Sequence, residues 1–129
     1  MPAGKYNIII EQGATYDVEI QYKDANNDNI DLTGYSGRMQ LRPSIGSTSS
    51  YLCLSSSLQP DGTGINFSGS SGTNSPVSGT IGIYISAATS SLLTFSTAVY
   101  DLEIQSGSVV TRLLQGNVQL SKEVTTGVC

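Results

Sequence analysis

Histidine and tryptophan are absent from this sequence of 129 residues, and cysteine occurs only twice. Histidine is the commonest general base near neutral pH and the commonest metal ligand, so its absence removes the chemistry of many catalytic and metal sites. The three lysines (Lys5, Lys23 and Lys122) have no supporting motif for Ser/Lys catalysis, and no serine lies in a Gly-x-Ser-x-Gly motif. We therefore expect no enzyme activity, no small-molecule substrate, and no catalytic, cofactor-binding or metal-binding residues.

Charge is also scarce, because only 12% of the residues are charged and the net charge is −4. The six Lys and Arg residues are scattered along the chain without a cluster. Binding to nucleic acids depends largely on neutralising phosphates, so we expect no nucleic-acid partner and, for the same reason, no membrane partner. No apolar run is long enough for a membrane-spanning helix or a signal peptide, and we expect the protein to mature in the cytoplasm of the cell that makes it.

The two cysteines, Cys53 and Cys129, are too few for a disulfide framework. Cys53 lies in the apolar run Tyr51-Leu52-Cys53-Leu54, which predicts a small buried thiol. Cys129 is the last residue of the sequence. A bridge between the two cysteines is an alternative that the sequence leaves open.

Serine, threonine and glycine replace the missing charges, with 20, 12 and 14 residues, and they favour short strands joined by turns. Apolar and polar residues alternate in several runs, a period of two that is typical of strands with one buried face. The first of these runs has Tyr16, Val18, Ile20 and Tyr22 on its inward face. The same signal predicts strands at 37–42, 81–85, 100–105 and 116–121. We expect 109–114 to be the hairpin partner of 100–105, and short strands at 51–54 and 64–68.

The stretch between 24 and 35 carries two turn signals. The Asp- and Asn-rich run 24–29 predicts a hairpin turn between a strand at 16–23 and the segment from Ile30. In the run Asp31-Leu32-Thr33-Gly34-Tyr35 we expect Asp31 or Thr33 to bond the turn amides. Gly34 would supply the unusual backbone angle before the chain enters the next strand at 36–42.

Three further signals mark the second half of the chain. Ser106-Gly107 predicts a two-residue hairpin turn. Gly116 indicates a bulge or bend where the alternation breaks after Leu113. Ser86 is a candidate N-cap for a short helical turn over 86–93, which we interpret as a connector between sheets.

These elements predict an all-β fold in one domain that covers residues 1–129. We expect a two-sheet antiparallel β-sandwich, immunoglobulin-like, with seven to eight strands and one short helical turn. A closed small barrel is the alternative. The Ser/Gly-rich stretch 44–79 is weakly patterned, and we expect a long, variable loop region there that serves as a contact surface.

Two carboxylate pairs are the candidates for acid–base chemistry: Asp17 with Glu19, and Asp101 with Glu103. A spacing of two places each pair on one face of a strand, and we interpret both pairs as the solvent face of an amphipathic strand. The seven tyrosines lie mostly at strand positions, which indicates sheet packing. Among them, Tyr100 is a candidate to anchor a loop through its hydroxyl, as tyrosine corners do in sandwiches.

One metal candidate remains, a run with the faint spacing of a calcium loop: Asp24, Asn26, Asp28 and Asp31. The EF-hand pattern needs Gly and Glu where this sequence has Asn29 and Tyr35, so that pattern does not match. We expect a solvated hairpin tip here, and a weak calcium site of another type is the alternative.

Three segments, taken in order, resemble a known group of proteins. They are 6–13 leading into the strand at 16–23, then 30–41, and then the C-terminal part from Tyr100 to Thr125. In this order they resemble the small β-sandwich virion proteins and modules of tailed bacteriophages, including myoviruses that infect cyanobacteria. The resemblance covers nearly the whole chain, with 44–79 as its variable part.

This resemblance implies a structural protein of the virion, of baseplate, tail-fibre or neck type, assembled in the host cytoplasm. It implies no enzyme activity and supplies no catalytic residues. We expect a tail, baseplate or fibre-attachment component that forms a homo-oligomer and contacts other virion proteins. The alternatives are a capsid decoration or cement protein and a host- or carbohydrate-binding module, although the lack of tryptophan weakens the last one.

Overall fold

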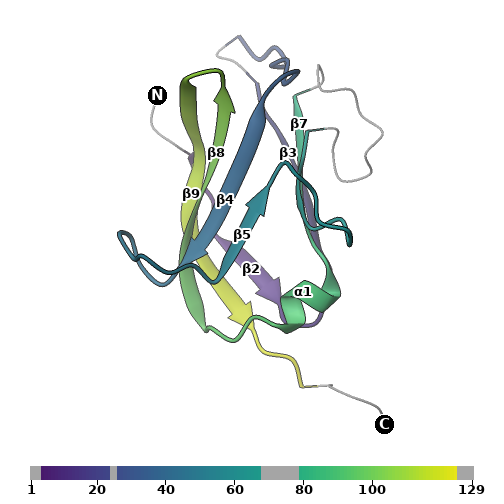
Figure 1. The fold of residues 1–129 in the computed structure, drawn as a ribbon, viewed down its shortest axis with the longest axis vertical. Helices are drawn as coiled ribbons and strands as arrows, with labels where there is room; N and C mark the ends of the chain where they lie inside the picture. The colour runs from purple at the N-terminus through teal and green to yellow at the C-terminus, as the bar shows by residue number, and fades with distance from the viewer. Residues whose placement is uncertain (1–3, 24–25, 68–78, 125–129) are drawn as a thin grey trace.

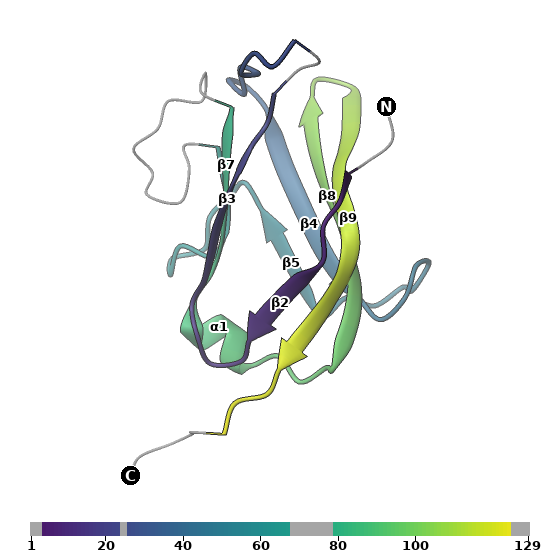
Figure 2. The same ribbon diagram turned by 180° about the vertical axis from the view of Figure 1, so that it is seen from behind.

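A computed structural model describes residues 4–23, 26–67 and 79–124 of the chain. These residues form two β-sheets that pack against each other, with one short helix at one end of the molecule (Figures 1 and 2). The described residues contain nine strands and one helix: β1 (Gly4–Lys5), β2 (Ile8–Glu11), β3 (Tyr16–Gln21), β4 (Ser36–Arg42), β5 (Leu52–Ser55), β6 (Gly64–Asn66), β7 (Thr80–Ile85), α1 (Ala87–Ser91), β8 (Thr97–Ser106) and β9 (Val109–Ser121).

The larger sheet has the strand order β1-β9-β8-β4-β5, with β2 also paired to β9, and the smaller sheet has the order β3-β7-β6. This arrangement confirms the all-β sandwich and the single short helix that the sequence predicts. The strand count exceeds the expected seven to eight because the N-terminal segment forms two short strands. Both sheets end in edge strands, so the alternative of a closed barrel is wrong.

The N-terminal strands differ from the antiparallel pairing that the sequence suggests. Both β1 and β2 pair with β9 in parallel, with Lys5 opposite Gln115 and Ile8 opposite Val118. Alternation within a strand reports which face is buried and carries no signal for the direction of its neighbour. The larger sheet is therefore mixed, and its other ladders are antiparallel.

The core lies between the two sheets and follows the predicted alternation. The isoleucines of β7 (Ile81, Ile83 and Ile85) are at most 1% exposed, whereas the inward residues of the edge strand β3 are only partly buried. No buried side-chain nitrogen or oxygen lacks a hydrogen-bond partner in the described ranges. The larger sheet contributes Ile8, Ile10, Met39, Leu41, Leu54, Ala98, Tyr100, Leu102, Ile104, Val118 and Leu120.

Two predicted local signals are confirmed. The backbone N–H of Thr33 donates to Asp31 Oδ1 at 2.9 Å, and Gly34 has a φ of +82°. The side-chain hydrogen bond from Thr33, followed by this backbone hydrogen bond, holds the pKa of Asp31 below its ordinary value. Ser86 caps α1, because its hydroxyl oxygen accepts from the backbone N–H of Thr89 at 3.1 Å.

The run 24–29 does not connect two strands that pair along their length, as the predicted hairpin turn would. The chain reverses there, with Lys23 bridged to Asn29, but β3 pairs with β7 while β4 joins the other sheet. The segment therefore connects two sheets, and residues 24 and 25 lie outside the described ranges.

The hairpin between β8 and β9 turns one residue later than predicted. Ser106 still pairs with Val109, so Gly107 and Ser108 are the two turn residues. The φ of Gly107 is +59°, as the first central position of a type II′ turn requires. The bulge in β9 lies at Leu113, which is skipped in the ladder, and Gly116 has a different role.

The prediction of a buried Cys53 thiol is wrong. Cys53 is exposed, since Leu54 on its C-terminal side takes the inward position of β5 and is 1% exposed. Within the described part of the stretch 44–79, β5 and β6 confirm the short strands expected at 51–54 and 64–68. Residues 68–78 and Cys129 lie outside the described ranges, so a Cys53–Cys129 bridge stays untested.

The parallel ladder between the N-terminal strands and β9 is interrupted at Tyr6 and Asn7, and side-chain hydrogen bonds span the interruption. The backbone N–H of Asn117 donates to the side-chain oxygen of Asn7 at 3.1 Å. The carbonyl of Tyr6 accepts from the hydroxyl of Tyr100 at 2.6 Å. Gly116 lies directly against this break, since a Cβ on it would overlap the Tyr6 carbonyl oxygen and lie 2.9 Å from the Tyr6 carbonyl carbon. Tyr100 thus anchors the N-terminal strands and not a loop at its own corner.

Gly116→Ala is expected to lower the free energy of unfolding by about 1–3 kcal/mol, because the new methyl group meets rigid backbone. The matched control is Gly4→Ala in the same seam, where a Cβ meets Leu114 Cδ2 at 3.4 Å and the Leu113 carbonyl oxygen at 3.8 Å, both ordinary contacts. The control is expected to change stability by less than about 0.5 kcal/mol. Urea unfolding of both variants measures the difference, and equal midpoints would contradict the packing described.

Asp61 ties the turn before β6 to the start of α1. Its carboxylate accepts from the Ser86 hydroxyl at 2.6 Å, from the Thr89 hydroxyl at 3.1 Å and from the backbone N–H of Thr63 at 3.0 Å. These hydrogen bonds favour the ionised form, with Ser86 the largest contributor, and they hold the pKa of Asp61 well below its ordinary value of 3.8. The carboxylate thus links two elements that are far apart in the sequence.

Asp61→Asn is expected to destabilise the protein at neutral pH, with the difference from the wild type shrinking in acid. Because the pKa of Asp61 is lower in the folded state, its contribution is present above pH 3.8 and is lost as the pH falls toward the folded value. Thermal unfolding measured over a series of pH values tests this, with Asp17→Asn on the exposed face of β3 as the control for loss of one charge. A difference that stays constant down to pH 2 (about two units below the ordinary pKa) would contradict the assignment.

Candidate functional site

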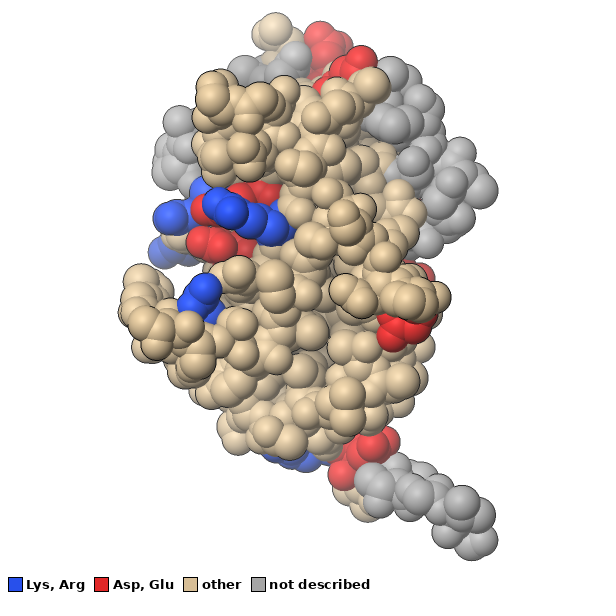
Figure 3. Space-filling view, in the orientation of Figure 1, with Lys and Arg blue, Asp and Glu red and all other residues tan. Residues whose placement is uncertain are grey.

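The fold gathers most of the cations onto one surface. Four of the six Lys and Arg residues line a groove of about 1010 Å³ on the outer face of the larger sheet. Two carboxylates line the same groove, which leaves an excess of two positive charges in a chain of net charge −4. Figure 3 shows these basic and acidic side chains interleaved on one side of the molecule. We call this surface the basic face and define it by Lys5, Arg38, Arg42, Arg112, Asp101 and Glu103.

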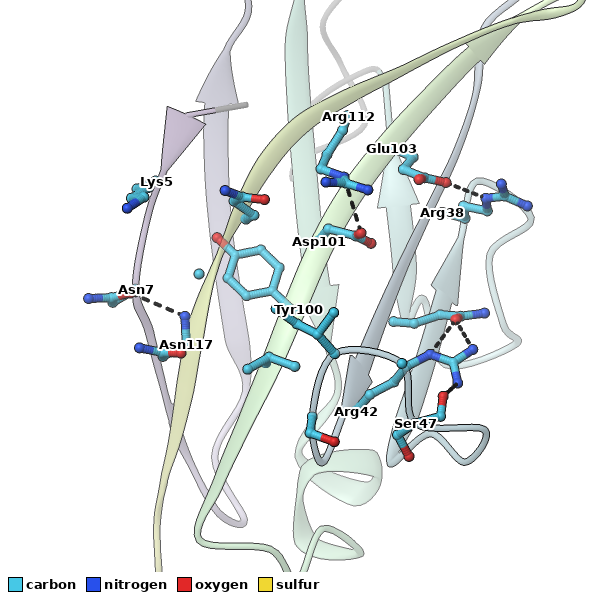
Figure 4. A pocket seen from close by; sticks show the side chains of 17 residues that line it. Lys5, Asn7, Arg38, Arg42, Ser47, Tyr100, Asp101, Glu103, Arg112 and Asn117 are labelled. Atoms are coloured by element: carbon cyan, nitrogen blue, oxygen red, sulfur yellow. Dashed lines mark hydrogen bonds and ion pairs between the residues drawn. The ribbon is translucent and has the colours of Figure 1, made fainter. Parts of the chain in front are cut away.

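Strand register places the charges of the basic face opposite one another. Arg38 of β4, Glu103 of β8 and Arg112 of β9 form one row across the sheet. Arg38 Nε lies 2.8 Å from Glu103 Oε1, and Arg112 Nε lies 3.4 Å from Asp101 Oδ2 (Figure 4). Both arginine side chains remain more than half exposed, so each pair contributes at most about 1 kcal/mol to stability. Their main effect is to fix the direction of the guanidinium groups.

Arg42 is held by neutral hydrogen-bond acceptors. Its guanidinium donates to the Gln40 side-chain oxygen at 3.0 and 2.5 Å and to the Ser47 carbonyl at 2.5 Å. These bonds fold the β4–β5 connection against the rim of the groove (Figure 4). Ile45, in this connection, also lines the groove and is 92% exposed.

The left side of the groove in Figure 4 depends on the broken parallel ladder. Lys5 lies just before the break and Asn7 lies within it, and the ring of Tyr100 points from β8 toward them beneath the surface. Burial, followed by the nearby Tyr16 and Tyr6, raises the pKa of Tyr100, and burial raises the pKa of Tyr16 to about 12. Both hydroxyls stay neutral at physiological pH, so Tyr100 acts as a hydrogen-bond donor and adds no charge to the basic face.

The sequence-predicted carboxylate pairs have different surroundings. Asp101 and Glu103 lie on the solvent face, as predicted, but each is paired with an arginine. Asp17 and Glu19 project from the outer face of the other sheet and take no part in the groove. The two pairs are therefore not brought together.

The calcium candidate stays a prediction. No three His, Cys, Asp or Glu side chains gather at a possible metal site within the part of the chain that the structure describes. Asp24 lies outside that part, so the set of Asp24, Asn26, Asp28 and Asp31 is not tested as a whole.

The six cations are scattered along the sequence, and the fold brings four of them together. Arg38 and Arg42 lie four residues apart and face outward on β4, while Lys5 and Arg112 come from opposite ends of the chain. The signal was present locally, since the alternation that buries Met39 and Leu41 must turn Arg38, Gln40 and Arg42 to solvent. Lys5 and Arg112 lie near these two arginines because of the strand order, which local patterns do not predict.

Within the described residues, no helix is long and apolar enough to span a membrane. No protein-family model matches the sequence, and no curated protein matches it.

The fold has relatives among solved structures. A crystal structure of a chicken TCR matches 94% of this chain with a TM-score of 0.52 and 9% sequence identity. The match covers 55% of the TCR chain, so this chain spans about half the length of that one. A likeness at this identity concerns the fold alone, and together with the two-sheet topology it shows that this chain has an immunoglobulin-like β-sandwich.

Proposed function

We propose that this chain is a structural protein of a tailed-bacteriophage virion, a tail, baseplate or fibre-attachment component that acts through contacts with other proteins. The basic face is the observation that carries the contact role. Its side chains are oriented by ion pairs and hydrogen bonds on a rigid sheet, and they surround an open groove. Arginine is enriched at protein interfaces, where its planar group makes several directed bonds.

The phage assignment is supported by the sequence resemblance of three ordered segments, which all lie within the sandwich. The segment 6–13 holds β2, 30–41 leads through the Asp31 turn into β4, and the C-terminal segment holds β8 and β9. Together they hold β2, most of β4 and β8, and β9 of the larger sheet, and with them Arg38, Asp101, Glu103 and Arg112 of the basic face, whereas β1 with Lys5, β5 and Arg42 lie outside them. A virion assembled in the host cytoplasm is the proposed location.

A host-glycan-binding module is the second candidate, and one observation favours it. Amide side chains of Asn7, Gln40, Gln115 and Asn117 line the groove and offer both donors and acceptors to sugar hydroxyls. Against this candidate, the described residues that line the groove offer no exposed aromatic ring on which a sugar could stack, because Tyr100 is 5% exposed. A glycan array on the properly assembled protein separates this candidate from a contact role.

The virion assignment predicts that the protein co-purifies with mature particles at a fixed copy number. Tagging the chain, purifying particles and locating the tag by electron microscopy measures both presence and place. Density at the tail or baseplate is expected, and absence from mature particles would refute the proposal. A copy number that scales with the capsid lattice would instead favour the decoration or cement alternative.

A further inference from the structure

The charges of the basic face are sorted by strand. Both carboxylates, Asp101 and Glu103, project from β8, which lies between β4 and β9 in the larger sheet. Two arginines project from β4 on one side, and Arg112 of β9 and Lys5 of β1 lie on the other side. Figure 4 shows the two carboxylates between Lys5 and Arg38. The basic face therefore presents a negative line along β8 with positive charges on each side of it.

The two arginines that pair with these carboxylates keep hydrogen-bond donors for a further acceptor. Arg38 donates to Glu103 through Nε, and within the described residues its two terminal NH₂ groups make no hydrogen bond. Arg112 Nε lies 3.4 Å from Asp101 Oδ2, and in the same ranges its guanidinium makes no hydrogen bond. A carboxylate binds two nitrogens of one guanidinium in a bidentate pair. Each arginine can therefore keep its own carboxylate and receive another from a second molecule.

We propose that the groove of the basic face binds an extended acidic segment of another virion protein, with carboxylates of the segment on both sides of β8. The inference rests on the proposed function, and it names the chemistry of the partner. The face has an excess of two positive charges, so two carboxylates from the partner would balance it. Complementary charge of this kind fixes the register of a contact and suppresses wrong partners.

Strand geometry sets the spacing that the acidic segment must match. Neighbouring strands lie about 4.8 Å apart, so β4 and β9 are separated by about 10 Å across β8. An extended segment that crosses the strands projects every second side chain toward the groove, about 7 Å apart at the backbone. The long side chains of glutamate and arginine span the remaining distance. Two glutamates with one residue between them would therefore contact both sides of the negative line.

The negative line on β8 favours a peptide over a nucleic acid. A nucleic-acid strand carries a phosphate on every nucleotide, so a strand across the groove would place negative charge over Asp101 and Glu103 as well as over the cations. A peptide can keep its acidic residues beside the cations alone. Among the described residues that line the groove there is also no exposed aromatic ring for a sugar, since Tyr100 is 5% exposed.

The net charge of −4 does not prevent an acidic partner from binding here. The Debye length is about 8 Å at physiological ionic strength, so charges on remote parts of the chain are screened while those at the contact are not. Binding is therefore governed by the local excess of positive charge in the groove.

Fluorescence anisotropy with the purified full chain tests the inference. The probe is a labelled peptide of alternating Glu and Ser, and its control has Gln in place of Glu. The wild type is expected to bind the Glu peptide about tenfold or more tightly than the Gln peptide, and to release it in 1 M NaCl, where the Debye length falls to about 3 Å.

Arg38→Gln with Arg112→Gln is expected to weaken binding of the Glu peptide by about tenfold or more, because both guanidinium groups are lost. Lys23→Gln with Lys122→Gln is the matched control, since it removes the same net charge at lysines outside the groove. The control is expected to bind within about twofold of the wild type, because those lysines are screened from the contact.

A second pair of substitutions tests the negative line by a gain of binding. Asp101→Asn with Glu103→Gln removes both carboxylates and raises the excess positive charge of the face from two to four. This variant is expected to bind the Glu peptide more tightly than the wild type does, and to gain affinity for oligo-thymidylate. Glu11→Gln with Asp17→Asn removes two carboxylates outside the groove and is its control. Circular dichroism checks that every variant is folded.

Several results would overturn the inference. They are equal binding of the Glu and Gln peptides, a lysine control that loses as much binding as the arginine variant, and a carboxylate variant that gains no more than its control. Tighter binding of the wild type to oligo-thymidylate or to polygalacturonate than to the Glu peptide would make a nucleic acid or an acidic glycan the occupant, and would overturn the acidic segment.

Failure of this inference is distinct from failure of the proposed function. A chain that is present in particles and does not distinguish the two peptides would keep the virion role and lose the acidic partner. A chain that binds the Glu peptide as expected and is absent from mature particles would lose the virion role.

Discussion

Every second residue of β8 points into the sandwich, and the strands on both sides of β8 are held in a register that repeats this division. Tyr100, Leu102 and Ile104 pack inward, and Asp101 and Glu103 face outward between them. The neighbours in register, Met39 on β4 and Leu114 on β9, lie beside Leu102, so one apolar row crosses three strands. A shift of one residue in this register would bury the charges and expose the core. The core and the basic face are thus consequences of one pairing.

The second constraint is the seam between the N-terminal strands and β9. The chain must pass close to Gly116, where its parallel ladder breaks at Tyr6 and Asn7. Both groups that the break releases find partners, since Tyr100 donates to the Tyr6 carbonyl and Asn7 accepts from Asn117. The Tyr100–Tyr6 bond is part-buried, where an unpaired polar group costs about 1–3 kcal/mol, whereas the Asn7–Asn117 bond is exposed to solvent. The seam also brings Lys5 to the groove, and in this way a fold-making contact completes the basic face.

Sequence patterns identified what depends on neighbours along the chain. The inward sets of the strands, the Asp31 turn and the Ser86 cap follow from residues a few positions apart. The parallel pairing of β1 and β2 and the gathering of Lys5 with Arg112 depend on strand order, which alternation does not encode.

The exposure of Cys53, in contrast, could have been predicted from the sequence. The sequence Leu-Cys-Leu places the cysteine on the face opposite Leu54, and the apolar character of the run concealed that alternation. The break in alternation near 113–116 correctly predicted a bulge in this strand, but the extra residue is Leu113 and not Gly116. A glycine is needed at 116 because the Tyr6 backbone passes close to it. Glycine in a strand fits either role, and only the neighbour that approaches it distinguishes them.

The central claim is that the basic face is the surface by which this protein is held in a larger assembly. Lysine acetylation compared between the isolated chain and purified particles tests it most directly, because Lys5 lies in the basic face and Lys122 lies outside it. The account predicts that Lys5 is modified several-fold less in particles than in the isolated chain, by more than any change at Lys122. Equal modification of Lys5 in both preparations would contradict the account.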